Sequence, residues 1–402
     1  MIMTPILMPG FLYYSTNTNI RVLWTFSGSN GSNPVLAPIQ VGGLLYGVTT
    51  EGGFFNTSSA RSYGALYSIN KNGTNYQLPH SFFGGVGPLY PDGDNNCGVP
   101  GQFSGYLIST GSLIIGTTYT GGPSTDFAQA HATTDCGGGA IFFYNTSNSS
   151  YNVTFPFISS SVYGNQPNSL IIYNNKIYGS AFYGGQGWGN FSTQGNGTIW
   201  STDINGNNQN IVYPFISSSI AGPTGFIQSG SSNMLYGSWL SSDGGIFSFD
   251  MNSNIFSELH TFSGGSDGSF PYIPPIVSGS TLYGGATNAG VTGSGVLYSI
   301  NTDGTGFSVI YNFGSTSAVN PSSNLYIIGN TIYGLSAGGA FNNGTIYSVN
   351  KNGTNFKILY NFTGSNDGQL SYNTFTVFDN VLYCTATYGG TYNEGTIFAY
   401  YL

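Results

Sequence analysis

Charge is what this sequence most lacks. Only 5% of its 402 residues are Asp, Glu, Lys or Arg, against roughly 25% in an average folded domain. Six Lys and Arg stand against 14 Asp and Glu, which gives a formal net charge of −8. The basic residues are scattered, whereas a protein that binds a nucleic-acid duplex needs a stripe of them to neutralise phosphates. The sequence therefore predicts no nucleic-acid partner.

Long apolar runs are also missing. No stretch approaches the roughly 20 apolar residues of a transmembrane helix, so we expect no membrane span. Residues 1–19 carry Pro5 and Pro9 and have no basic segment before their apolar residues. We therefore expect them to form an irregular arm rather than a secretory signal. A mature chain is still compatible with an extracellular location, if a signal was removed upstream of this numbering.

Cysteine is scarce, with Cys97, Cys136 and Cys384 in the whole chain. Three cysteines allow at most one internal bridge, which excludes a small fold held together by disulfides. What the chain has instead is 62 Gly, 31 Tyr and 29 Phe. Aromatic residues favour strands and glycine favours turns, so the composition predicts an all-β protein.

Three short signatures each occur seven times along the chain. The first is a strand that ends in Phe, the second is an [LI]-Y-G strand, and the third is G-x-[LI]-[YFW]-[SFA]. The first signature ends at Phe26, Phe82, Phe157, Phe215, Phe262, Phe313 and Phe362; the third starts at Gly64, Gly139, Gly197, Gly244, Gly295, Gly344 and Gly395. The last four intervals between third signatures are 47, 51, 49 and 51 residues, which is typical of propeller blades.

A further apolar strand precedes each [LI]-Y-G strand, so each unit holds four antiparallel strands, which we call a, b, c and d. Seven such units predict a single seven-bladed β-propeller over residues 20–402. The blade repeats end near residues 82, 157, 215, 262, 313, 362 and 402. The first repeat element is a d strand at 21–26, and the last unit, 373–402, lacks one. Pairing these two segments would close the ring and protect two sheet edges.

The best-preserved units read G-x-[LI]-[YF]-S-x-N-x-[DN]-G-T-x-F-x-x-[LI]-x-x-F, as at residues 295–313 and 344–362. This unit, with the [LI]-Y-G strand and a Gly-Gly pair, resembles the GloVer tandem repeat. The resemblance implies a β-propeller repeat protein, often surface-anchored, and carries no catalytic residues. Blades two and three depart from the pattern, and Gly139–Asn145 lacks the Asn-Gly-Thr turn.

Strand order divides the loops between two faces. The a–b and c–d turns share one face and are short and uniform, whereas the b–c and d–a connections share the other and vary in length. Function usually resides in variable loops on a rigid scaffold. We call the face with the b–c and d–a connections the variable face, and we expect it to carry a binding surface for a protein or glycan partner. The alternative is that the aromatic residues of these loops pack the loops onto the rim of the propeller. The candidates are Phe54, Phe55, Tyr63, Tyr90, Phe127, His131, Trp188 and Phe191.

Two further predictions fall on this face. Cys97 and Cys136 lie in two long insertions of one blade, so a Cys97–Cys136 disulfide is predicted, with free thiols as the alternative. Asp92, Asp94 and Asn96 place oxygen ligands at alternating positions, which suits calcium. The distal Glu of an EF-hand is missing, and ordinary turn chemistry explains the same residues. No other cofactor is expected.

The sequence offers little for catalysis. His80 and His260 stand in d strands where other blades have Phe, Tyr or Trp, so we expect them to be scaffold residues. His131 has Cys136 nearby, but two ligands do not make a zinc site. No nucleophile elbow or phosphate-binding loop occurs. The sequence does not exclude the paired carboxylates of a glycosidase, because pairing across blades is invisible in sequence. The candidates are Asp243, Asp267, Asp367 and Glu394.

Eleven Asn-x-Ser/Thr sequons occur, at Asn30, Asn56, Asn72, Asn145, Asn148, Asn152, Asn190, Asn196, Asn343, Asn352 and Asn361. They follow from the composition or mark glycans in a secretory setting. The leading hypothesis is a non-enzymatic structural or interaction propeller of an extracellular surface or a virus-like particle, possessing no catalytic site and forming part of a larger assembly. The alternatives are a glycan-binding propeller and a glycan-active hydrolase or lyase.

Overall fold

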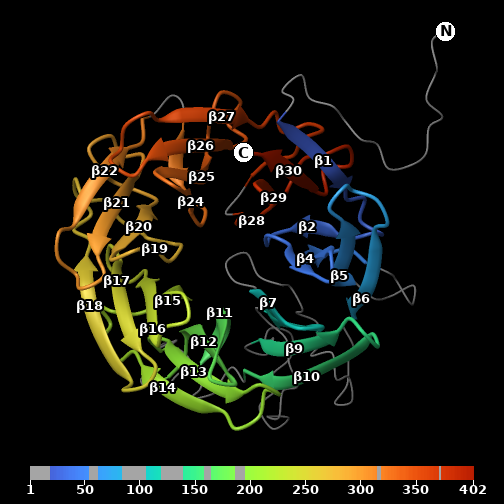
Figure 1. Ribbon diagram of the computed structural model, residues 1–402, viewed down its shortest axis with the longest axis horizontal. Coiled ribbons are helices and arrows are strands. Elements are labelled where there is room, and N and C mark those ends of the chain that lie inside the picture. Colours follow the sequence, from blue (N-terminus) through green and yellow to red (C-terminus); the bar gives the residue numbers. More distant parts are fainter. Residues whose placement is uncertain are drawn as a thin grey trace, which may run out of the picture.

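Seven antiparallel sheets stand around a common centre (Figure 1). The computed structural model describes residues 19–53, 62–83, 106–118, 139–157, 164–185, 195–314, 318–370 and 373–402. Within these ranges every regular element is a strand, and there is no helix. The predicted all-β, seven-bladed propeller is confirmed. Of the expected N-terminal arm, residues 1–18 lie outside the described ranges.

Each blade runs from an inner strand a, beside the centre, to an outer strand d at the rim (Figure 1). Blade 1 consists of β2 (Ser32–Pro34), β3 (Ile39–Val41), β4 (Leu44–Glu51), β5 (Ser62–Asn70) and β6 (Gln77–Phe83). Blade 2 consists of β7 (Leu107–Thr110), β8 (Leu113–Thr118), β9 (Ala140–Asn145) and β10 (Ser150–Pro156). Blade 3 consists of β11 (Asn165–Tyr173), β12 (Lys176–Tyr183), β13 (Thr198–Asp203) and β14 (Asn210–Pro214).

Blade 4 consists of β15 (Pro223–Gln228), β16 (Met234–Trp239), β17 (Gly245–Asp250) and β18 (Ile255–Thr261). Blade 5 consists of β19 (Ile276–Ser278), β20 (Thr281–Ala286), β21 (Val296–Asn301) and β22 (Ser308–Asn312). Blade 6 consists of β23 (Val319–Pro321), β24 (Tyr326–Ile328), β25 (Thr331–Ala337), β26 (Thr345–Asn350) and β27 (Lys357–Asn361). Blade 7 consists of β28 (Phe375–Phe378), β29 (Val381–Ala386), β30 (Thr396–Tyr401) and β1 (Ile20–Thr25). The inner strand of blades 1 and 6 is split into two short pieces, which pair with the same b strand.

Strands b and c are mostly buried, as the apolar and aromatic residues on both of their faces predict. β29 is buried at all six positions, whereas β18, at the rim, contains only half-buried and exposed residues. The hydrophobic clusters span neighbouring blades; one of them joins Tyr178 of blade 3 to Phe247 of blade 4. The core is therefore a series of layers between blades, and each blade depends on its neighbours.

The glycine of the [LI]-Y-G strand makes room for a ring. Gly179 pairs in register with Trp200, and a Cβ at Gly179 would overlap the indole. The same glycine lies against Tyr67, Phe142, Phe247, Tyr298 and Tyr347 in other blades. In blade 7 Cys384 takes this place opposite Phe398 and is buried, as expected for a small core residue.

The glycine at the start of strand c packs against a residue of the next blade, in most cases a proline. Gly295 has φ +90°, and a Cβ there would approach Cδ of Pro321 to 2.7 Å. Beside this contact the Asn320 N–H donates to the Ser294 carbonyl at 2.8 Å. Proline also meets this glycine at Gly139–Pro167, Gly197–Pro223, Gly244–Pro271 and Gly395–Pro34, while Leu370 replaces it at Gly344. This contact ties the inner strand of one blade to the c strand of the blade before.

Stacked rings join the outer strands. The ring two residues before the d-strand Phe lies flat on a ring that starts the next d strand. Trp24 and Tyr76 show this with centroids 4.1 Å apart and planes within 2°. The other stacked pairs are His80–Tyr151, Tyr213–Phe256, His260–Phe307 and Tyr311–Phe356. Such a pair contributes about 0.5–1.5 kcal/mol beyond the burial of its area.

The N-terminal strand closes the ring. β1 pairs with β30 antiparallel, from Ile20 opposite Tyr400 to Thr25 opposite Thr396. The Phe26 N–H donates to the Gly395 carbonyl at 3.0 Å, and Pro34 packs on the same glycine. The predicted closure is confirmed, with the strand at Ile20–Thr25 rather than at 21–26.

Deletion of residues 1–26 should leave β30 with an open edge and blade 7 without its outer strand. We expect a large loss of the cooperative thermal transition and aggregation, because an unpaired edge recruits other strands. Deletion of residues 1–18, which keeps β1, is the matched control. A melting temperature for the 1–26 deletion equal to that of the control would contradict this account of closure.

Substitution of Tyr298 or Tyr347 by Phe should stabilise the fold by about 1 kcal/mol each, because both hydroxyls are buried without a hydrogen-bond partner among the described residues. Blades 2 and 4 already carry Phe142 and Phe247 in the same slot. Denaturant unfolding measures the change, and Tyr401→Phe, with an exposed ring, serves as the control. Loss of stability in both core variants would mean that each hydroxyl has a partner.

Candidate functional site

The b–c loops and the d–a corners form one face of the propeller, which we call the variable face. The a–b and c–d turns form the opposite, uniform face. In blades 4 to 7 most of the variable face lies within the described residues, so its side chains can be followed there. Polar side chains on this face form hydrogen bonds that stabilise the d–a corners, whereas several apolar side chains are exposed to solvent.

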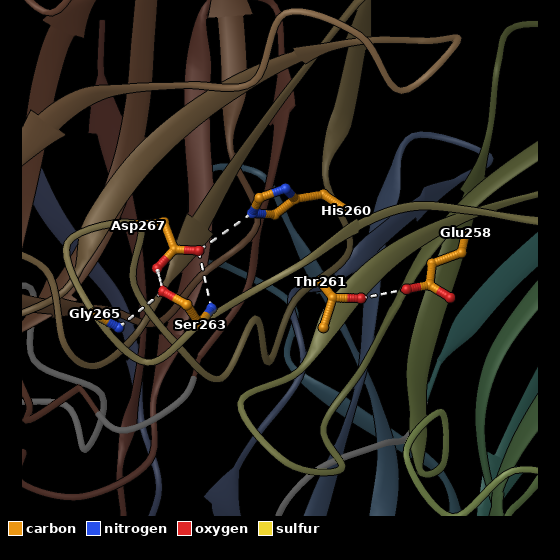
Figure 2. Close-up of polar contacts among 6 residues, drawn as sticks. All are labelled: Glu258, His260, Thr261, Ser263, Gly265 and Asp267. Atoms are coloured by element: carbon orange, nitrogen blue, oxygen red, sulfur yellow. Dashed lines mark hydrogen bonds and ion pairs between the residues drawn. The ribbon is translucent and has the colours of Figure 1, made fainter.

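The corner after strand d of blade 4 is built on Asp267 (Figure 2). Its carboxylate accepts hydrogen bonds from the backbone N–H of Ser263 at 2.9 Å and from the Ser263 hydroxyl at 2.5 Å. Nε2 of His260 lies 3.5 Å from the same carboxylate. Burial raises the pKa of Asp267, but the hydrogen bonds from Ser263 and the nearby His260 outweigh it and hold the pKa below its usual value.

The corner after blade 6 repeats this design. Asp367 accepts from the N–H of Thr363 at 2.9 Å, from its hydroxyl at 2.5 Å, and from the Tyr360 hydroxyl at 2.8 Å. The side chain of Asp367 is buried. At the corner that follows β1, the side-chain oxygen of Asn30 takes the place of the carboxylate and accepts one hydrogen bond, from the Ser27 N–H at 2.8 Å. A carboxylate saturated in this way shapes a turn and is poorly placed to accept a substrate proton.

The other two candidate carboxylates also lie at corners. Glu394 accepts a hydrogen bond from the Ser32 hydroxyl across the closing joint. The Asp243 carboxylate lies against Gly264, where a Cβ would come within 2.6 Å of it. Thus the four acidic residues suggested for glycan cleavage each contact a corner segment. Among the described residues no three His, Cys, Asp or Glu side chains gather as a metal site would require.

The two described histidines are joint residues, as their place in the d strands predicts. His80 stacks on Tyr151 with centroids 3.7 Å apart, and His260 stacks on Phe307 at the same distance. Burial lowers the pKa of His80 to about 4. Burial also lowers the pKa of His260, although Asp267 opposes the shift.

Most residues predicted for the binding site lie outside the described ranges. These are Phe54, Phe55, Tyr90, Phe127, His131, Phe191 and Trp188, the calcium candidates Asp92, Asp94 and Asn96, and the pair Cys97–Cys136. Tyr63 lies in β5, but its side chain is not described. All of these stay predictions.

The described part of the variable face shows aromatic residues that sequence reasoning missed. Phe341 and Tyr392 are each 59% exposed, and Tyr388 is 37% exposed. Phe341 and Tyr392 follow a Gly-Gly pair in the b–c loops of neighbouring blades, each with Asn next in sequence. The pattern G-G-x-[FY]-N was the available signal, and it also occurs at residues 52–56.

The described sequons differ in exposure. The asparagines are exposed at Asn72, Asn148, Asn152 and Asn352, and half-buried at Asn30, Asn145, Asn196, Asn343 and Asn361. Asn56 and Asn190 lie outside the described residues. Asn361 accepts a bond from the Ala340 N–H at 2.9 Å, so its amide supports the b–c loop that carries Phe341.

Replacement of His80 by Tyr should remove one source of acid sensitivity. The pKa of His80 is about 4 in the fold and near 6.5 in an unfolded chain. The unfolded chain therefore binds more protons, and stability falls as pH drops from about 6.5 to about 4. We expect wild type to lose on the order of 2 kcal/mol relative to His80→Tyr across this range, after discounting for the half-buried ring.

Denaturant unfolding at several pH values measures this difference, and subtraction of the two curves removes the carboxylates that both proteins share. Tyr is already found at this position as Tyr213 and Tyr311. A difference that does not change with pH would contradict the assigned pKa.

Comparison with known proteins bears on the fold. Oligogalacturonate lyase in complex with manganese superposes with a TM-score of 0.55 at 11% identity, covering 99% of this chain and 97% of that one. The extracellular domain of the putative one-component system BT4673 from B. thetaiotaomicron gives a TM-score of 0.55 at 10% identity, covering 94% of this chain and 40% of that one. At this identity the likeness shows the fold alone. Comparison with curated proteins gives no match.

Within the described ranges the structure contains no helix that is long and apolar enough to cross a bilayer. Residues 238–402 match the model of the Gloeobacter/Verrucomicrobia repeat. This segment holds the units in which the repeat is clearest. The match over residues 238–402, together with the seven blades closed by β1, fits a GloVer-type repeat propeller.

Proposed function

We infer that this propeller is a non-enzymatic structural or interaction module of an extracellular surface or a virus-like particle, and that its variable face binds a partner. The observation that carries the proposal is the exposure of Phe341 and Tyr392, 59% each, at matching b–c loops of blades 6 and 7. Large rings at such tips are costly to leave in water, and aromatic anchors dominate many interfaces.

The polar chemistry of the same face supports a binding role over a catalytic one. Asp267 and Asp367 are committed to their own corners, and His260 is stacked in a joint. Hydrolysis by paired carboxylates needs one acid and one base facing a common substrate. The glycan-active hydrolase or lyase is therefore the weaker alternative. Loss of product formation in Asp243→Asn or Glu394→Gln would establish it.

A glycan is the favoured partner class if the ligand is small. Phe341 and Tyr392 are each followed by an exposed asparagine, Asn342 and Asn393. An aromatic ring stacks on the apolar face of a sugar, and an amide both donates to and accepts from hydroxyls. Because two adjacent blades repeat this pair, an extended glycan would find two similar subsites.

The double variant Phe341→Ser/Tyr392→Ser should lose at least about tenfold in affinity, or about 1.4 kcal/mol, for a glycan found on an oligosaccharide array. Its unfolding should match wild type, since both rings are exposed. Ile255→Ser, which changes an exposed apolar residue on the uniform face, is the control.

If no array glycan binds, the same variants are tested by cross-linking in the native assembly. A protein partner should then cross-link to blades 6 and 7 in wild type and in Ile255→Ser, but not in the double variant. Unchanged glycan affinity or unchanged cross-linking in the double variant would contradict the proposal.

A further inference from the structure

A groove opens on the uniform face between blades 6 and 7, away from the proposed binding face. Its volume is about 450 Å³, and Tyr333, Asn350, Lys357 and Tyr401 are among the residues that line it. A volume in this range suits a small ligand. The groove takes no part in the interactions described so far.

The repeat explains why a groove lies here. At other joints the c–d turn of one blade covers the d strand before it. Gly73 lies over Leu23 and Gly304 over Leu259, three residues before the d-strand Phe. In blade 7 strand c is β30 and strand d is β1, and no turn links them. Leu359 holds the equivalent position in blade 6 and lines the groove.

The groove contains a cation in a chain that has few. Lys71 forms an ion pair with Asp379 at 2.8 Å, and Lys351 donates to the Ser278 hydroxyl at 2.8 Å. Lys357 is exposed, and within the described residues no carboxylate lies within ion-pair distance of its ammonium. The two preceding blades carry Ser257 and Ser308 at this position. Lys357 therefore brings a positive charge to this joint, and in the described part of the chain no carboxylate forms an ion pair with it.

The remaining lining residues suit a hydroxylated ligand. Tyr401 is 43% exposed, and its ring offers an apolar face. The Asn350 amide nitrogen donates to the Thr354 hydroxyl at 3.0 Å, which leaves its oxygen as an acceptor for a ligand hydroxyl. Ser348 adds a hydroxyl to the wall. A ring, an amide oxygen and an ammonium match the three chemical parts of a sugar acid.

We propose that this groove binds a sugar acid. The Lys357 ammonium pairs with the carboxylate, the Tyr401 ring lies on the apolar face of the sugar, and Asn350 accepts from a hydroxyl. The charge-assisted bond supplies the preference for an acid over a neutral sugar. The site is open, so we expect weak binding, with a Kd of about 1 mM.

Glucuronate is the probe, titrated into the full chain by calorimetry and by saturation-transfer NMR. Lys357→Gln should weaken glucuronate binding at least about tenfold and leave the weak binding of glucose unchanged. Tyr401→Ala should weaken both sugars. Lys176→Gln, which removes an exposed lysine of blade 3, is the matched control and should bind as wild type. Matching thermal unfolding shows that each variant is folded.

Three results would overturn the proposal. Equal affinity for glucose and glucuronate in wild type would remove the role of Lys357. Inorganic phosphate bound as tightly as glucuronate would mean a bare anion site. Binding that survives Lys357→Gln and Tyr401→Ala would place the sugar elsewhere. Phe341→Ser/Tyr392→Ser should leave glucuronate binding intact, so this test stands or falls independently of the variable face.

Discussion

The joint between blades is the contact on which this propeller depends. A blade alone would expose apolar residues on both sides of its b and c strands, so it cannot fold without neighbours. The joint combines a proline on the glycine that opens strand c with a ring stacked on a ring between outer strands. Each contact joins different strands of the two blades, so together they fix the angle between blades. The closing joint uses the same parts, Pro34 on Gly395 and Trp24 on Tyr76, although its strands come from opposite ends of the chain.

The fold was predictable because these contacts recur as sequence. Glycine and aromatic residues at fixed offsets gave the strand order, the blade number and the pairing of β1 with β30. The physical role of the repeated glycines was not predictable, because no sequence signature indicates that Gly295 packs against Pro321 of the following blade. His80 and His260 were correctly placed in the scaffold because they replace rings of other blades. Their stacking partners were found only in three dimensions.

The candidate site was less predictable, for a physical reason. Loops freed from blade packing need not keep the repeat, so their sequences say little about which side chains converge. Asp267 and Asp367 were candidates for the paired carboxylates of a glycosidase. In the structure both carboxylates accept hydrogen bonds from residues of their own corner segments. Phe341 and Tyr392 went unnoticed because aromatic residues are abundant throughout the chain. Only exposure separates them from the many rings that form the core.

The pairing of β1 with β30 also sets the order of events in synthesis. Among the strands of the ring β1 leaves the ribosome first, yet its partner strand follows 380 residues later, as the register of Ile20 with Tyr400 requires. Until then blade 1 has no neighbour on one side, and β1 has no sheet to join. Contacts this distant in sequence form slowly and leave intermediates exposed to aggregation. The pairing of β1 with β30 stabilises the finished ring. It also means that β1 and blade 1 cannot complete their packing until the strands of blade 7 have been made.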